Sequence, residues 1–148
     1  MSKADDISRE TTLYVRDTCL CLHVQRAARA LARRFDEAFR PLGLTSGQFS
    51  LMMSLNRPEP PTIGSVASLL AMDRTTLTAA LKPLQRRGLV EVARDEKDRR
   101  SRRLKLTPAG RGLLASAVPV WRRTHAELDT ILPDGDSDRL RRDLIALS

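Results

Sequence analysis

One stretch, residues 72–106, constrains the fold of this chain more than any other. It opens with a helix pattern in which Leu77, Leu81 and Leu84 recur at helical spacing and so share one face. Asp73, just before this pattern, is of a residue type that caps helix N-termini. The stretch therefore predicts an amphipathic helix, whose other faces carry Arg74, Thr75, Thr78, Lys82 and Gln85.

A strand–loop–strand pattern follows this helix directly. Gly88 stands where a glycine commonly ends a helix. Leu89–Ala93 and Leu104–Leu106 have the pattern of two strands, and residues 94–103 form a charged loop between them. A helix followed by such a hairpin predicts a winged helix-turn-helix, which is mainly α with a small β-hairpin wing.

The positive charge of the chain is concentrated in the same region. Residues 82–111 contain eleven Lys and Arg against four Asp and Glu, and this net +7 nearly equals the +8 of the whole chain. On its own, a charged run is more often a solvated surface than a binding site. Here it lies between two strands and after a capped helix, which favours nucleic acid as the partner, because a major groove admits a helix and phosphates attract cations.

The residues before Asp73 complete a helix-turn-helix. Thr62 can cap a short helix over residues 63–70, and Ala71–Met72 forms the tight turn into the second, reading helix. Pro83 lies inside that reading helix, where it removes a backbone donor. We expect a bend or an early loosening there.

Helix patterns also flank the winged segment. Residues 8–40 have the pattern of one long helix, and Thr45 with Gln48 forms a capping box that begins the next. Thr107, followed by a proline, starts a helix to about residue 132, with a kink expected at Pro119.

The ends of the chain predict an oligomer. Ser137 or Asp138 caps a last helix, residues 138–147, which is half apolar, as is the first helix. Because the first helix is longer than a compact domain needs, a second copy of the chain is the simplest partner for it. We therefore expect N-terminal dimerisation helices in residues 1–43, the winged domain in 44–106, and C-terminal dimerisation helices in 107–148.

Composition excludes several classes of protein. The 148 residues suit one domain, and the low aromatic content of 3% implies a core of Leu, Ala and Val. We find no apolar run long enough for a membrane span and no signal-peptide pattern, so we expect a cytoplasmic protein. We also find no nucleophile–base set, no glycine-rich phosphate loop and no metal-ligand spacing, so we expect neither an enzyme nor a cofactor or metal.

Three motifs together resemble the MarR family of bacterial transcriptional regulators. In chain order they read LTSGQFSLM, SVASLLAMDRTTLTAALKPLQRRGLV and RDEKDRRSRRLKLTPAG, within a resemblance that covers about Val24 to Trp121. The resemblance implies a homodimer that binds a pseudo-palindromic operator on double-stranded DNA. It also implies release from that operator, as for a repressor, when a small and often aromatic molecule binds near the joint between the winged and dimerisation parts.

The resemblance places DNA contacts on the reading helix and the wing. Asp98 and Arg100 match an aspartate that holds an arginine, and that arginine enters the minor groove, whose negative potential attracts a guanidinium. Ala79 departs from the many members that have arginine there, which weakens the case for direct guanine readout. The residues expected to contact DNA are Arg74, Thr75, Thr76, Thr78, Lys82, Arg94, Asp98, Arg99, Arg100 and Arg102.

An effector pocket is expected where the first helix, the second helix and the helix after Thr107 meet. An arginine in such a cleft would favour a carboxylate effector. Aromatic and methionine side chains at helical spacing are, however, more often plain core. The candidate lining residues are His23, Arg26, Phe49, Met53, Trp121 and His125.

Two other functions stay open. One branch of the family senses hydroperoxides through a first-helix cysteine, and Cys21 lies at that position. The two tyrosines that hydrogen-bond the thiolate in that branch are replaced here by Phe35 and Ser46, which disfavours a thiol-based sensor. The remaining hypothesis is a winged-helix protein-interaction module that does not bind DNA.

Overall fold

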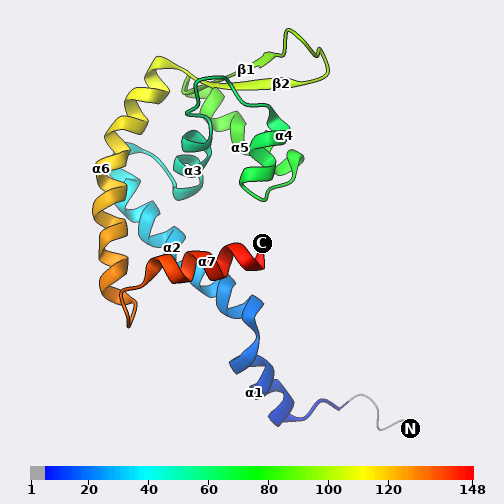
Figure 1. Cartoon of the computed structure of the whole chain (residues 1–148), viewed down its shortest axis with the longest axis vertical. Helices are drawn as coiled ribbons and strands as arrows, with labels where there is room; N and C mark the ends of the chain where they lie inside the picture. The colour runs from blue at the N-terminus through cyan, green and yellow to red at the C-terminus, as the bar shows by residue number, and fades with distance from the viewer. Residues whose placement is uncertain (1–5) are drawn as a thin grey trace.

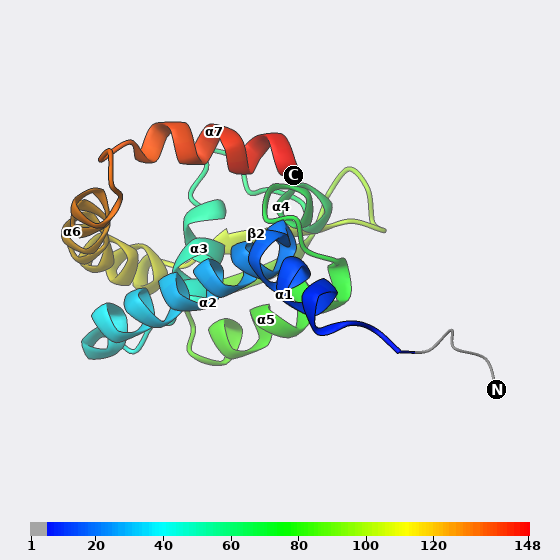
Figure 2. The same cartoon turned by 90° about the horizontal axis from the view of Figure 1, so that it is seen from below.

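The computed structural model describes residues 6–148, and it confirms a mainly helical fold with a β-hairpin wing. The winged unit lies at one end, α2 and α6 lead away from it, α7 crosses α2, and α1 lies at the far end (Figure 1). Seen from below, α7 and α5 lie on opposite sides of α2 (Figure 2). The elements are α1 (Arg9–Thr18), α2 (Leu20–Phe39), the 3-10 turn η2 (Arg40–Leu42), α3 (Ser46–Ser54), α4 (Ile63–Leu69), α5 (Arg74–Arg86), β1 (Val90–Arg94), β2 (Arg102–Leu106), α6 (Pro108–Ile131) and α7 (Ser137–Leu147).

The prediction of one long N-terminal helix was wrong, because the chain breaks at Cys19. This residue is extended, with φ −67° and ψ 109°, and it ends α1 and caps α2. Its thiol sulfur accepts the backbone N–H of Leu22 at 3.5 Å, and the Thr18 hydroxyl bonds back to the carbonyl of Tyr14 at 2.7 Å. Such side-chain bonds compete with a continuous helix, and α1 has no buried residue that would hold it in line with α2.

Local capping begins each helix of the winged unit as the sequence predicts. The α3 capping box of Thr45 and Gln48 is formed, Thr62 caps α4, and Asp73 caps α5. The helix α5 continues through Pro83 to Arg86, so the expected early loosening does not occur.

The core of the winged unit is apolar and closed. Leu77, Leu81 and Leu84 of α5 are at most 1% exposed, as their shared face predicts. They pack in one cluster with Phe39 at the end of α2 and with buried residues of α3, α4, α6 and the hairpin. The buried face of α5 thereby fixes which of its faces points outward.

The turn between α4 and α5 requires an unusual backbone. Ala71 has φ 51°, in the left-handed region that costs a residue with a Cβ about 1–2 kcal/mol. The turn is closed by hydrogen bonds from the N–H of Met72 to the carbonyl of Ala67 and from the N–H of Ala71 to that of Ser68. This geometry sets the direction in which α5 leaves α4.

The wing is an antiparallel pair that is longer than predicted. Val90 lies opposite Leu106, and the pairing continues to Arg94 opposite Arg102, so the connecting loop is shorter than residues 94–103. On its outer edge β2 also pairs with the α3–α4 loop, through the N–H of Leu104 and the carbonyl of Pro61 at 2.9 Å. The wing is therefore tied to the helix-turn-helix at its base.

The start of α6 is locked against the hairpin. Thr107 caps α6, and its hydroxyl also donates to the carbonyl of Gly88 at 2.6 Å. A Cβ on Gly110 would run into the backbone carbonyl of Leu89, so only glycine allows this approach. The helix then runs without a break through Pro119.

The C-terminal helix begins one residue earlier than predicted. Its N-cap is Asp136, whose carboxylate accepts the N–H of Arg139, rather than Ser137 or Asp138. Neither α7 nor α1 has a buried residue. Within residues 6–148, no helix is both long and apolar enough to cross a membrane.

Candidate nucleic-acid interface

The outward face of α5 presents a row of polar side chains to solvent. Because three leucines bury the opposite face, Arg74, Thr75, Thr78 and Lys82 are all exposed. With Ala79 they line a shallow hollow of about 340 Å³. The structure thus brings together four of the residues predicted to contact DNA on this helix.

The helix cap uses one of the predicted contact residues. The two carboxylate oxygens of Asp73 accept the backbone N–H of Thr76 at 2.7 Å and its hydroxyl at 2.8 Å. These two hydrogen bonds, that of the N–H first, lower the pKa of Asp73 below its ordinary value. The Thr76 hydroxyl therefore serves the cap, whereas the neighbouring Thr75 is fully available on the outer face.

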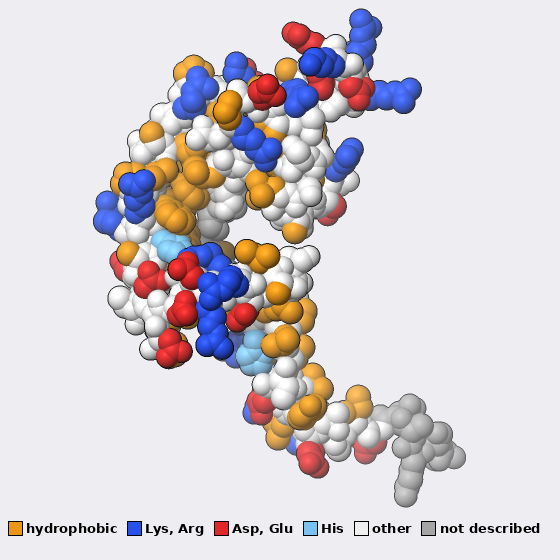
Figure 3. Space-filling view, in the orientation of Figure 1, with side chains coloured by type: hydrophobic (Ala, Val, Ile, Leu, Met, Phe, Trp, Pro, Cys, Tyr) orange, Lys and Arg blue, Asp and Glu red, His pale blue; other side chains and the backbone are white. Residues whose placement is uncertain are grey.

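The wing tip carries a second group of exposed cations. Arg94, Arg99, Arg100 and Arg102 are all exposed, and Lys97 lies beside them. Figure 3 shows Lys and Arg gathered at the tip of the wing, with a few acidic side chains among them. The five predicted wing residues, Arg94, Asp98, Arg99, Arg100 and Arg102, thus lie on one exposed tip.

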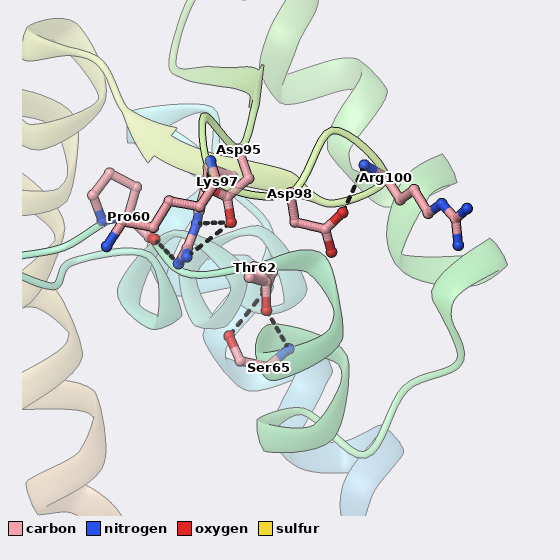
Figure 4. A network of polar contacts seen from close by, with 8 residues as sticks. Pro60, Thr62, Ser65, Asp95, Lys97, Asp98 and Arg100 are labelled. Atoms are coloured by element: carbon pink, nitrogen blue, oxygen red, sulfur yellow. Dashed lines mark hydrogen bonds and ion pairs between the residues drawn. The ribbon is translucent and has the colours of Figure 1, made fainter.

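The expected pairing of Asp98 with the Arg100 guanidinium is not formed. One Asp98 carboxylate oxygen instead accepts the backbone N–H of Arg100 at 3.0 Å. The Arg100 side chain extends away from Asp98 (Figure 4). Asp98 therefore shapes the backbone of the tip, and the Arg100 guanidinium is left to solvent.

An arginine that the sequence did not single out holds the wing in place. The Arg103 guanidinium donates two bonds to one Asp95 oxygen, at 3.0 and 3.2 Å, and another at 2.9 Å to the carbonyl of Pro60 in the α3–α4 loop. The Asp95 side chain is 13% exposed and that of Arg103 37% exposed. The backbone N–H of Lys97, and then Arg103, hold the pKa of Asp95 below its usual range.

Three of the predicted pocket residues line one apolar cavity. Phe49, Met53 and Trp121 border a hollow of about 530 Å³, together with the unpredicted Leu69 and Arg122 and with Ser50, Ser54 and Val118. Trp121 stacks on Phe49, with ring centroids 6.5 Å apart.

The other three predicted pocket residues, His23, Arg26 and His125, lie outside this cavity. His125 packs against the ring of Trp121, with centroids 4.8 Å apart, and does not border the cavity. The Nδ1 atom of His23 lies 2.7 Å from the carbonyl oxygen of Cys19. His23 and Arg26 are exposed on α2 and do not line this cavity.

Cys21 lies exposed on α2, away from the reading helix. Its sulfur accepts a hydrogen bond from the Gln25 side chain at 3.3 Å. Neither His23 nor Arg26, the nearby side chains that could hydrogen-bond this thiol in place of the missing tyrosines, does so.

A family model and a curated relative both match this chain. Residues 44–101 match the family model of the MarR family. The transcriptional regulator TtmR of Methylorubrum extorquens is 36% identical over 97 residues, which are 66% of this chain and 50% of TtmR. This chain therefore spans about half the length of that curated relative.

Solved structures match over nearly the whole chain. The transcriptional regulator MosR of M. tuberculosis in complex with DNA is 40% identical, with a TM-score of 0.79 over 87% of this chain and 92% of MosR. The repressor CouR bound to a 23-mer DNA duplex is 29% identical, with a TM-score of 0.79 over 90% of this chain and 94% of CouR. These relatives are transcriptional regulators and not enzymes. This chain matches the MarR family model, has the winged fold, and is 40% identical in sequence to MosR across 92% of the MosR chain. These findings show that this chain belongs to the MarR family of transcriptional regulators.

Proposed function

We propose that this protein is a sequence-specific regulator that binds double-stranded DNA through α5 and the wing. The observation that carries the proposal is that one fold exposes Arg74, Thr75, Thr78 and Lys82 on a helix, and a group of arginines on the adjacent hairpin. The helix has the width that a major groove admits, and the hairpin reaches the backbone or minor groove beside it. The likeness to MosR and CouR, both solved on DNA, supports the same use of the fold here.

The alanine variant Arg100→Ala tests this proposal. Its guanidinium is exposed and unpaired with Asp98, so its removal leaves the fold unchanged and should weaken duplex binding about tenfold or more. The matched control is Arg123→Ala, which removes another exposed arginine, on α6. A winged module that only binds proteins would lose no DNA affinity in either variant.

We further propose that the protein acts as a homodimer on a pseudo-palindromic operator. In this division, residues 44–106 bind DNA, and residues 1–43 and 107–148 join the two copies. The support is a set of large apolar side chains that α1, α2 and α7 leave exposed, including Val15 at 53%, Leu20 at 66% and Ile145 at 73%. Figure 3 shows such side chains along α2 and α7.

Repression is the proposed outcome of binding, following CouR. A dimer seated across a promoter excludes polymerase from it. In-vitro transcription from a template that carries a selected binding site tests the direction. A rise in transcript on adding the protein would contradict repression and indicate activation.

The apolar cavity supports a small aromatic anion as the effector. Phe49, Met53 and Trp121 offer flat and polarisable walls, and Arg122 supplies a cation that can pair with a carboxylate. Leu69 brings α4 into the same cavity, so a ligand there would press on the helix-turn-helix. This contact offers a route from ligand binding to release of DNA.

The single tryptophan of the chain makes the cavity easy to test. Titration with 4-hydroxybenzoate should change the fluorescence of Trp121 and weaken DNA binding. Replacement of the cation in Arg122→Met should weaken the response to benzoate-type anions but leave that to the uncharged phenol. Equal responses in both proteins would rule out the carboxylate contact.

A further inference from the structure

Arg74 lies at the junction of α4 and α5. It is the first residue of α5 and directly follows Asp73, which caps this helix. Its guanidinium also lies over the first turn of α4, because a Cβ built on Gly64 would be 2.9 Å from a guanidinium nitrogen and 3.6 Å from Cζ. Arg74 thus lies in the first turn of α5 with its guanidinium against the backbone of Gly64 in α4.

The Asp73 carboxylate caps α5 but does not pair with the Arg74 guanidinium. The adjacent Asp73 directs both carboxylate oxygens to Thr76. Arg74 forms no ion pair within residues 6–148. Its side chain is exposed and borders the hollow on the outer face of α5. The Arg74 guanidinium is therefore held by contact with α4 and not by an acidic partner among the described residues, so it is free to pair with an anion from another molecule.

Gly64 is not required by the backbone at its position. It is the second residue of α4 and does not have the positive φ that favours glycine. Alanine would favour a helix more strongly than glycine there. What glycine provides is room, because any side chain at residue 64 would occupy the space in which the Arg74 guanidinium lies.

We propose that Gly64 is a positioning residue for DNA recognition, whose bare backbone forms the surface on which Arg74 is held toward the duplex. Gly64 itself need not touch DNA. It confines a flexible guanidinium to the junction of α4 and α5, which reduces the entropy that Arg74 would lose on binding. This inference rests on the proposed function, since it assigns Arg74 a DNA contact.

The test is a double-mutant cycle between Gly64→Ala and Arg74→Ala. Affinity is measured with a duplex of about 30 bp, long enough for two half-sites one turn apart, selected from a random library by the wild-type protein. Gly64→Ala should lower affinity about three- to tenfold, because the displaced guanidinium loses one charged contact. Its thermal unfolding midpoint should stay the same or rise. In the Arg74→Ala background, Gly64→Ala should change affinity less than about twofold.

A second glycine provides the matched control. Gly112 lies in α6, and a Cβ there meets nothing within 4 Å, so Gly112→Ala should leave affinity unchanged and the unfolding midpoint the same or higher. Arg74→Ala alone should weaken DNA binding without lowering the unfolding midpoint, because the Arg74 side chain is exposed and has no ion-pair partner within residues 6–148.

Three results would overturn the inference. Gly64→Ala could bind DNA as the wild type does, it could lose the same affinity in the Arg74→Ala background, or Arg74→Ala could bind without loss. The second result would mean that alanine distorts α4. In all three cases a loss of affinity in Arg100→Ala would leave the proposed function standing, whereas a wild-type protein that selects no duplex would end both proposals.

Discussion

The winged unit and the terminal helices of this chain are built in opposite ways. In the winged unit, α5 buries three leucines completely, each helix has a side-chain cap, and Arg103 and Thr107 tie the hairpin to its neighbours. In α1 and α7 no side chain is buried, and apolar residues such as Ile145 face solvent. The winged unit buries its apolar side chains within one chain, whereas the terminal helices leave theirs exposed, although they too have side-chain caps.

In the proposed function, this difference separates the part that recognises DNA from the part that joins two copies of the chain. Because the leucine face of α5 closes the core, its outer face can carry exposed polar side chains such as Arg74, Thr75 and Lys82. The terminal helices expose an apolar surface whose burial would be favourable, at about 25 cal/mol per Å². We therefore interpret the winged unit as the rigid reader and the terminal helices as half of an interface.

The largest expected effect comes from charging the terminal helices. In the double variant Leu20→Asp, Ile145→Asp both side chains are more than half exposed in the single chain, so its fold should not change. Light scattering should show the mass of one chain, and DNA affinity should fall about a hundredfold or more as bivalent binding is lost. Leu69→Asp, which charges an equally exposed leucine of α4, should keep the dimer mass. A double variant that remains dimeric would remove the distinction between the two regions.

The next largest effect should come from the junction of α6 and the hairpin. Gly110→Ala places a Cβ against the backbone carbonyl of Leu89, which cannot move aside as a flexible side chain could. We expect a loss of about 3 kcal/mol in the free energy of unfolding, measured with denaturant. Gly112→Ala, two residues along the same helix, should cost almost nothing. Equal stability of the two variants would contradict the close packing of Gly110 against the backbone of Leu89.

A smaller loss of stability should follow when the wing loses its side-chain bonds to the α3–α4 loop. Arg103→Met keeps most of the apolar stem but removes the bonds to Asp95 and Pro60. Because Arg103 is about one-third exposed, we expect only about 1 kcal/mol of lost stability, with faster amide exchange in β2. The neighbouring Arg102→Met should give the reverse pattern, with unchanged stability and weaker DNA binding, because Arg102 is exposed at the tip. The same pattern in both variants would argue against separate roles.

The smallest effect should be a pH dependence that is confined to acid. The pKa values of Asp73 and Asp95 are lowered in the folded chain, so each carboxylate stabilises the fold above its unfolded pKa, near 4. That contribution is lost as the pH falls below about 4 and through the folded pKa values. The variant Asp73→Asn keeps a cap but does not titrate, so its unfolding free energy should fall less between about pH 5 and pH 2. A parallel decline in wild type and variant would remove Asp73 as a cause.

Local sequence signals predicted much of the winged unit. Thr45, Thr62, Asp73 and Thr107 cap their helices as expected, because each cap depends on residues only three positions away. The buried face of α5 followed from helical spacing alone. The N-cap of α7, Asp136, was not predicted, because several neighbouring residues have equally good capping side chains.

Long-range contacts could not be predicted in the same way. Arg103 is one of several arginines in the wing, and its partner Pro60 is 43 positions away, so nothing local distinguished it from Arg100. The break at Cys19 was missed because the apolar spacing continues across it, although the backbone does not. In the candidate pocket, Phe49 and Trp121 stack on each other, and the arginine that borders the cavity is Arg122 instead of Arg26.

The central claim is that the outer face of α5 and the wing neutralise DNA phosphates, and the salt dependence of duplex binding tests it most directly. If the dimer neutralises about 6–10 phosphates, affinity should fall on the order of a thousandfold between about 50 and 200 mM salt. The slope should become shallower in Arg100→Ala. A flat response to salt, with equal slopes in both proteins, would contradict the claim.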